Sequence, residues 1–188
     1  MVGGFPLTRP ARDLSAEVLS DIPARWDHVV GVARRAGEIG GNLPAVQRDL
    51  VTASAWLHDI GYAEGLASTG MHALDGALHL AHLGWPADVV GLVAFHTGAA
   101  VEADERGLAG MLVGFPRPPG HLLDILTAAD LTSGPAGDRV TATERIDEIL
   151  TRYEAADPVH RAVLRSRAAL LAAVARTGGC SGSPDEDV

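Results

Sequence analysis

Histidine and aspartate side chains recur at six positions of this chain, each within or next to an apolar stretch. Neutral imidazole nitrogens and carboxylate oxygens are common ligands of divalent first-row metal ions. Two of the residues are adjacent, in TASAWLHDIGY, and the other four are single residues far apart in the chain. In chain order, the candidate ligands are His28, His58, Asp59, His72, His96 and Asp130. Together they indicate a metal-dependent enzyme.

The two carboxylates give the strongest reason to expect a metal ion. Asp59 ends the apolar segment VTASAWLHD, and Asp130 ends the apolar segment LLDILTAAD. A buried charge is costly unless it is paired or binds a metal. A divalent cation between Asp59, Asp130 and the histidines would satisfy all of them at once.

Structural roles are the alternatives for the same residues. The His58-Asp59 pair could cap the end of a helix, and His28 and Asp130 could form a buried hydrogen-bonded pair. His72 and His96 could similarly lie at helix ends without binding anything. His79 and His82 share the predicted helix of His72 and are expected to be solvated or packed rather than to bind a metal.

Apolar residues at helical spacing predict the elements that position these side chains. Prolines near the start and glycines after the end mark several boundaries. The predicted helices cover 23–39, 42–60, 72–83, 85–98, 121–132, 141–153 and 158–176, and that at 141–153 has a charged face. No stretch shows the alternation of a strand, and no repeat is present. The sequence therefore predicts a single all-α domain.

The remaining segments are predicted to lack regular structure. Residues 1–13 indicate an irregular N-terminal arm, with the helical pattern and the domain starting at Leu14 and running to residue 176. Residues 99–120 are the longest predicted irregular stretch and a candidate lid, with a short helix possible around GLAGMLV. The tail, 177–188, is polar and acidic and is predicted to be disordered.

Composition excludes several classes of function. The 188 residues carry 24 acidic and 15 basic side chains, a net charge of −9, which argues against a nucleic-acid or anionic-membrane surface. An acidic protein can still bind phosphate through a metal ion or a few placed arginines. With Cys180 as its one cysteine, the chain can form no disulfide framework. No signal peptide or membrane-spanning run is recognised, so we expect a cytoplasmic protein.

As an ordered set, the six residues resemble the pattern H…HD…D of the HD-domain metal-dependent phosphohydrolase superfamily. The resemblance covers roughly residues 20–155 and implies a single HD-domain helical bundle. His72 in MHALDGA and His96 in FHTGA are similar to the additional histidines of its dinuclear members. HTGA and AADLTSG are similar to segments of bacterial HD hydrolases of diadenosine tetraphosphate.

Carried over residue by residue, the resemblance implies two divalent transition-metal ions, with iron or manganese the leading candidates. His28, His58, Asp59 and Asp130 would hold the first ion. His72 and His96 would hold the second, with Asp59 bridging the pair. A water or hydroxide between the ions would be the nucleophile, which makes Asp59 the central catalytic residue.

The chain departs from the superfamily pattern after HDIG, where Tyr62 stands in place of a frequent lysine that can contact substrate phosphate. Three arginines could substitute for that lysine. Arg106 and Arg117 lie in the predicted loop 99–120, and Arg139 follows the turn SGPAGD. The alternative for all three is that they are surface residues that do not contact the substrate.

The function that the resemblance implies is hydrolysis of a small phosphorylated, nucleotide-like molecule. Two alternatives remain open from the sequence. The same ligand set resembles HD-type mixed-valence di-iron oxygenases that cleave C–C or C–P bonds, and a degenerate HD domain could be a non-catalytic sensor. The apolar helix faces could also include a homodimer interface.

Overall fold

The computed structural model describes residues 6–178 and is all-α, as predicted. Among these residues no strand forms, and Ser133 and Arg139 make an isolated β-bridge. The helices in chain order are α1 (Thr8–Val18), α2 (Pro23–Ile39), α3 (Ala45–Leu57), α4 (His72–His82), α5 (Ala87–Phe95), α6 (Ala99–Glu105), α7 (Ala109–Leu112), α8 (Gly120–Leu131), α9 (Ala142–Arg152) and α10 (Pro158–Arg176). Short 3₁₀ helices are η1 (Gly40–Asn42), η2 (Ile60–Tyr62) and η3 (His96–Gly98).

Local sequence signals explain several helix starts. Pro23 and Pro158 occupy the first turns of α2 and α10, where a missing backbone N–H costs nothing. Asp157 caps α10 by accepting from the backbone N–H of Val159. Thr141 and Glu144 form a capping box at the start of α9. These signals are local, so they could be recognised without the tertiary structure.

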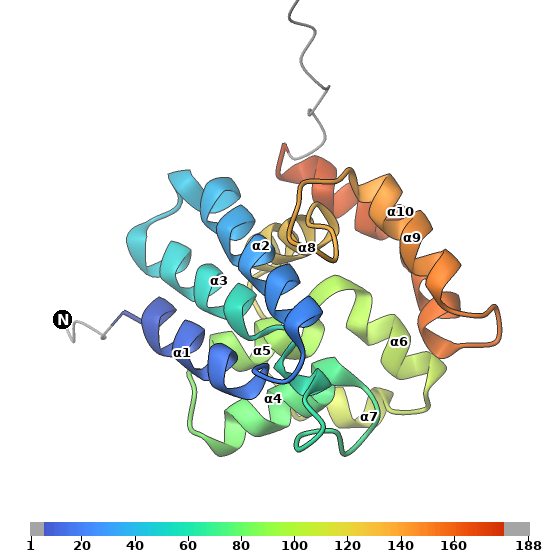
Figure 1. The fold of residues 1–188 in the computed structure, drawn as a ribbon, viewed down its shortest axis with the longest axis horizontal. Helices are drawn as coiled ribbons and strands as arrows, with labels where there is room; N and C mark the ends of the chain where they lie inside the picture. Colours follow the sequence, from blue (N-terminus) through green and yellow to red (C-terminus); the bar gives the residue numbers. More distant parts are fainter. Residues whose placement is uncertain (1–5, 179–188) are drawn as a thin grey trace, which may run out of the picture.

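α5 is the central helix, and its residues from Val89 to Phe95 are buried on every face. It contacts α3, α4 and α8, while α2 lies against both α3 and α8 (Figure 1). The C-terminal helix α10 covers α6, α8 and α9 on the opposite side (Figure 1). The segments that carry the candidate ligands therefore meet in the interior, between the helices packed around α5 and those covered by α10.

Two segments predicted to be irregular are helical. The stretch 99–120 contains α6, α7 and the first residue of α8, which corrects the prediction of a long loop. Its polar residues misled the prediction, because Glu102 is buried on α6 and pairs with Arg106 one turn later. The short helix expected around GLAGMLV is confirmed as α7. The predicted disorder of 177–188 falls almost entirely outside the described residues.

The N-terminal arm is also corrected, because α1 begins at Thr8 and not at Leu14. Asp49 of α3 accepts hydrogen bonds from the backbone N–H groups of Leu7 (2.6 Å) and Thr8 (3.0 Å) and from the Thr8 hydroxyl (2.7 Å). A carboxylate from another helix thus satisfies the free donors at the start of α1. No local pattern in 1–13 could reveal this tertiary cap.

We expect Asp49→Ala to lower the free energy of unfolding by about 1–2 kcal/mol, since the start of α1 loses its acceptor. Burial alone raises the pKa of Asp49, but the hydrogen bonds from Leu7 and Thr8 lower it below its ordinary value. This contribution is therefore present above the pKa of the unfolded chain and is lost as the pH falls through the lower pKa of the folded state. Urea unfolding of both proteins at pH 7 and near pH 3 measures it. An equal difference at both pH values would contradict the role assigned to the carboxylate.

In the described part of the chain, none of the helices combines the length and apolar character that a membrane span requires.

Candidate metal centre

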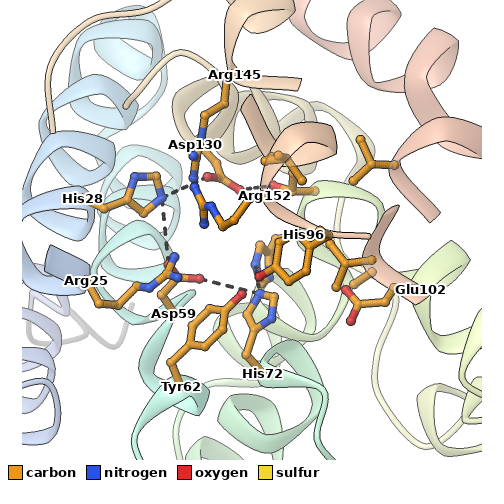
Figure 2. A pocket seen from close by; sticks show the side chains of 16 residues that line it. Arg25, His28, Asp59, Tyr62, His72, His96, Glu102, Asp130, Arg145 and Arg152 are labelled. Carbon is orange, nitrogen blue, oxygen red and sulfur yellow. Dashed lines mark hydrogen bonds and ion pairs between the residues drawn. The ribbon is translucent and has the colours of Figure 1, made fainter. Parts of the chain in front are cut away.

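The six candidate ligands lie together in one interior site, and Figure 2 shows five of them, all except His58. His28 lies in α2, His72 begins α4, and Asp130 lies in the last turn of α8. The other three follow helix ends: His58 and Asp59 come directly after α3, and His96 comes directly after α5. Three helices and the turns that follow two others thus supply the site, which explains why its members are far apart in the sequence.

The ligand atoms form two groups. His28, His58 and Asp130 make one, and Asp59, His72 and His96 make the other, with the ligand atoms of each group within 4.8 Å of one another. Asp59 lies between them. Its Oδ2 is 3.8 Å from Nε2 of His28, and its Oδ1 is 3.5 Å from Nε2 of His58 and 3.6 Å from Nε2 of His72. Its position is suited to the predicted bridging role.

Backbone carbonyls fix the orientation of three of the imidazole rings. Nδ1 of His28 donates to the carbonyl of Gly134 (3.0 Å), Nδ1 of His58 to that of Ala55 (2.8 Å), and Nδ1 of His96 to that of Val93 (2.6 Å). A carbonyl oxygen only accepts, so each Nδ1 must carry the proton. In the neutral ring Nε2 then presents its lone pair to the site, as is usual for metal-binding histidines.

Two observations show that the site fits a cation: an unpartnered ring nitrogen and a close pair of acceptors. Nε2 of His58 is fully buried and has no hydrogen-bond partner among the described residues. Nε2 of His28 lies 3.1 Å from Oδ1 of Asp130, so two acceptors face each other unless a proton or a metal ion lies between them. Asp59 and Asp130 are only 3% and 8% exposed. Buried carboxylates and imidazoles with unused lone pairs are the donor set that a divalent metal ion requires.

The pKa values of four candidate ligands favour the protonation states that bind metals. His28 differs, because burial lowers its pKa but the hydrogen bond to Asp130 and the nearby carboxylates raise it above the ordinary value. Burial lowers the pKa of His72 to about 3 and also lowers the pKa of His58, so both rings are neutral. Burial raises the pKa values of Asp59 and Asp130. Neighbouring histidines and, at Asp59, Arg25 outweigh this effect and hold both pKa values well below the ordinary value. Neutral imidazoles and ionised carboxylates need lose no proton before they coordinate an ion.

Arg25 and Tyr62 flank the second ligand group. Nη1 of Arg25 donates to Oδ2 of Asp59 (2.8 Å), and its guanidinium lies 3.9 Å from the centre of the Tyr62 ring. The Tyr62 ring in turn stacks on the His72 imidazole, with ring centres 4.2 Å apart. Tyr62 thus orients His72, and Arg25 provides a cation beside the position where the superfamily often has a lysine.

Thr97 adopts a strained backbone conformation beside the site. Its φ of 41° is the one positive φ of a non-glycine residue in the described chain, and Gly98 follows at φ 80°. Strained residues concentrate at functional sites, where the surrounding structure holds them in place. The Thr97 hydroxyl donates to Oδ2 of Asp130, which orients that carboxylate. The sequence reasoning noted the string HTGA but assigned no role to Thr97.

A cavity of about 580 Å³, including the part open to solvent, adjoins the ligand groups. It does not include the three arginines predicted to contact substrate. Arg106 pairs with Glu102, Arg117 lies over the Phe95 ring, and Arg139 pairs with Glu38 at the surface. Sequence position in a predicted loop was therefore a poor guide to these side chains.

The arginines that do line the cavity are Arg25, Arg145 and Arg152. Arg25 could have been found from the sequence, because it lies one turn before His28 on the same helix and so faces the same way. Arg145 and Arg152 belong to α9, which was predicted as an ordinary helix with a charged face and no part in the site. Their position depends on the packing of α9 against the rest of the fold, which the sequence pattern does not specify.

Comparison with known families agrees with the geometry. The family model of the HD domain matches residues 25–134, which include all six candidate ligands. The match spans more than half of the chain, and this protein belongs to the HD-domain family. Searches of the curated proteins and of the solved structures found no match.

Proposed function

We propose that this protein is a metal-dependent phosphohydrolase that acts on a small phosphorylated, nucleotide-like substrate. The observation that carries the proposal is the meeting of two ligand groups with three arginines in one cavity. A phosphoryl group has oxygen atoms for both kinds of partner, since metal ions and guanidinium groups each bind phosphate oxygens.

The chain's own residues have distinct parts in this proposal. His28, His58 and Asp130 would hold one ion, His72 and His96 would hold the other, and Asp59 would contact both. Iron and manganese suit such mixed imidazole and carboxylate ligands. When bound, two divalent ions supply a water of lowered pKa and neutralise charge that develops on phosphorus. Arg25 can turn from Asp59 toward the phosphate when an ion neutralises that carboxylate.

The arginines also favour a phosphohydrolase over the other functions that share the ligand set. An HD-type di-iron oxygenase that cleaves a C–C bond of an uncharged molecule needs the same ligands but no cluster of cations around the cavity. One that cleaves a C–P bond would also bind an anionic substrate, and it is distinguished by oxygen uptake. A sensor that merely binds metal needs no arginines beside the ligand groups, whereas Arg25, Arg145 and Arg152 line this cavity. The presence of all six candidate ligands together with a cationic cavity supports a reaction at a phosphoryl group.

Metal analysis and phosphate release test the proposal. We expect about two transition-metal ions per chain after reconstitution with Mn²⁺ or Fe²⁺, and phosphate release from at least one member of a panel of nucleotides and sugar phosphates. A chelator should abolish the release, and added metal should restore it. Protein without bound metal, or metal-loaded protein that consumes oxygen and releases no phosphate, would contradict the proposal. The oxygen uptake would favour the oxygenase.

A further inference from the structure

One face of α9 is aimed at the cavity. Glu148 follows Arg145 by three residues and Arg152 follows it by seven, so all three lie on the same side of the helix. Arg145 and Arg152 line the same cavity as His28 and Asp130, and Figure 2 shows both guanidinium groups on the Asp130 side. α9 begins after the segment 25–134 that matches the HD family. The match to the family model therefore does not extend to these residues.

Arg145 is a buried cation with an unused hydrogen-bond donor. It is 5% exposed, and its Nε is buried without a hydrogen-bond partner among the described residues. Glu148 accepts from Nη1 of Arg145, but it also accepts from Arg152, whose Nε lies 2.9 Å from Oε1. Two guanidinium groups thus share one carboxylate. A buried charge with an unused donor is costly, and an anion in the cavity would supply the missing partner.

The wall beside these arginines is apolar. Ile149 of α9 lines the cavity and lies one helical turn from each arginine, and Val159 and Val163 of α10 line the same cavity. A ligand that places an anionic group on the arginines can therefore contact these aliphatic side chains with its organic part. Guanidinium groups bind phosphate through paired, charge-assisted hydrogen bonds, which makes a phosphate group the best match for this anion.

We propose that Arg145 and Arg152 form a phosphate-binding subsite on α9, positioned by Glu148, which holds a phosphate group of the substrate while its organic part contacts the apolar wall. The proposal rests on the proposed function for the identity of the ligand as a substrate. The subsite itself does not depend on catalysis, so phosphate binding can be measured separately from hydrolysis.

The first experiment measures binding of inorganic phosphate by calorimetry to the full chain after chelator treatment, at low ionic strength. We expect saturable binding to the wild type, at least tenfold weaker binding to Arg145→Lys, which keeps the charge but loses Nε, and weaker binding to Arg152→Gln. Arg167→Gln is the matched control, because Arg167 joins α9 and α10 outside the cavity through Asp147. Its phosphate affinity should stay within about twofold of the wild type. Binding equal to the wild type in both cavity variants would overturn the proposal.

Circular dichroism and thermal unfolding separate binding from folding. Arg152 lies at the exposed end of α9, so Arg152→Gln should fold even if a change at the buried Arg145 does not. Weaker phosphate binding by Arg152→Gln with an unchanged melting temperature supports the subsite. A lower melting temperature with unchanged phosphate affinity in this variant would show a purely structural role.

Kinetics of the metal-loaded enzyme then distinguish the two proposals. With a substrate found in the panel, Arg152→Gln should raise KM at least about tenfold and change kcat less, whereas Arg167→Gln should change neither. An unchanged KM with active enzyme would overturn the subsite and leave the hydrolase standing. If phosphate binding depends on Arg145 and Arg152 but the protein hydrolyses no substrate, the subsite stands and the proposed hydrolase function is overturned.

Discussion

Asp59→Asn is expected to abolish turnover, with kcat falling at least about 10³-fold, or roughly 4 kcal/mol of activation free energy. Asp59 lies between the two ligand groups, with oxygens 3.5 to 3.8 Å from Nε2 of His28, His58 and His72. The amide keeps the volume of the side chain but removes the charge that would hold both ions. Metal content should therefore fall from about two ions per chain to one or none. Parallel kinetics and metal analysis of the purified variant measure both effects.

The controls for this variant come from the same chain. Helix content by circular dichroism should match that of the wild type, because the change adds no volume to the core. His79→Ala removes a histidine of α4 that lies outside both ligand groups and should keep full turnover and metal content. Normal turnover of Asp59→Asn, or a large loss in His79→Ala, would show that the ligands are wrongly assigned.

Gly61→Ala is expected to destabilise the fold by at least about 3 kcal/mol, lowering the melting temperature by about 6–12 °C. A Cβ at this position would lie 2.0 Å from the carbonyl oxygen of His72 and 2.6 Å from the backbone nitrogen of Gly76. Both atoms belong to the α4 backbone, which cannot yield as a flexible side chain could. Because η2 must move away from α4, the distance between Asp59 and His72 should also grow and metal should bind more weakly. Thermal unfolding and metal titration test the two effects.

Gly37→Ala provides the matched control within α2. No atom lies within 4 Å of a Cβ at this site, so alanine should stabilise the helix by about 0.5–1 kcal/mol. If Gly61→Ala unfolded at the same temperature as the wild type, the close approach between η2 and α4 would not exist in solution.

The all-α fold could be predicted because it depends on local patterns, and the meeting of the candidate ligands could be predicted because, as an ordered set, they resemble the HD pattern. Pro23 and Pro158 mark helix starts within their own segments, and the apolar stretches around His58 and Asp130 indicate that these side chains are buried. A polar residue at the end of a buried helix needs a hydrogen-bond, ionic or metal partner, and this need can be inferred without knowing which segment supplies the partner. The identity of the ions and of the substrate remains a prediction.

The errors arose where tertiary contacts outweigh local composition. The start of α1 depends on Asp49, 41 residues after Thr8, and Glu102 is buried on α6 in the wall of the cavity. Arg145 looked like part of a solvated helix face, yet α9 packs so that this residue is buried in the cavity. Charged residues in these segments were interpreted as exposed because sequence pattern alone does not show which neighbour covers them.

The cavity arginines of α9 come from a stretch of chain separate from every candidate metal ligand. A substitution on that helix can change which molecules the protein accepts while the residues that activate water keep their places. Selectivity and reactivity would then be adjustable independently, which gives a protein engineer one short helix in which to alter substrate preference.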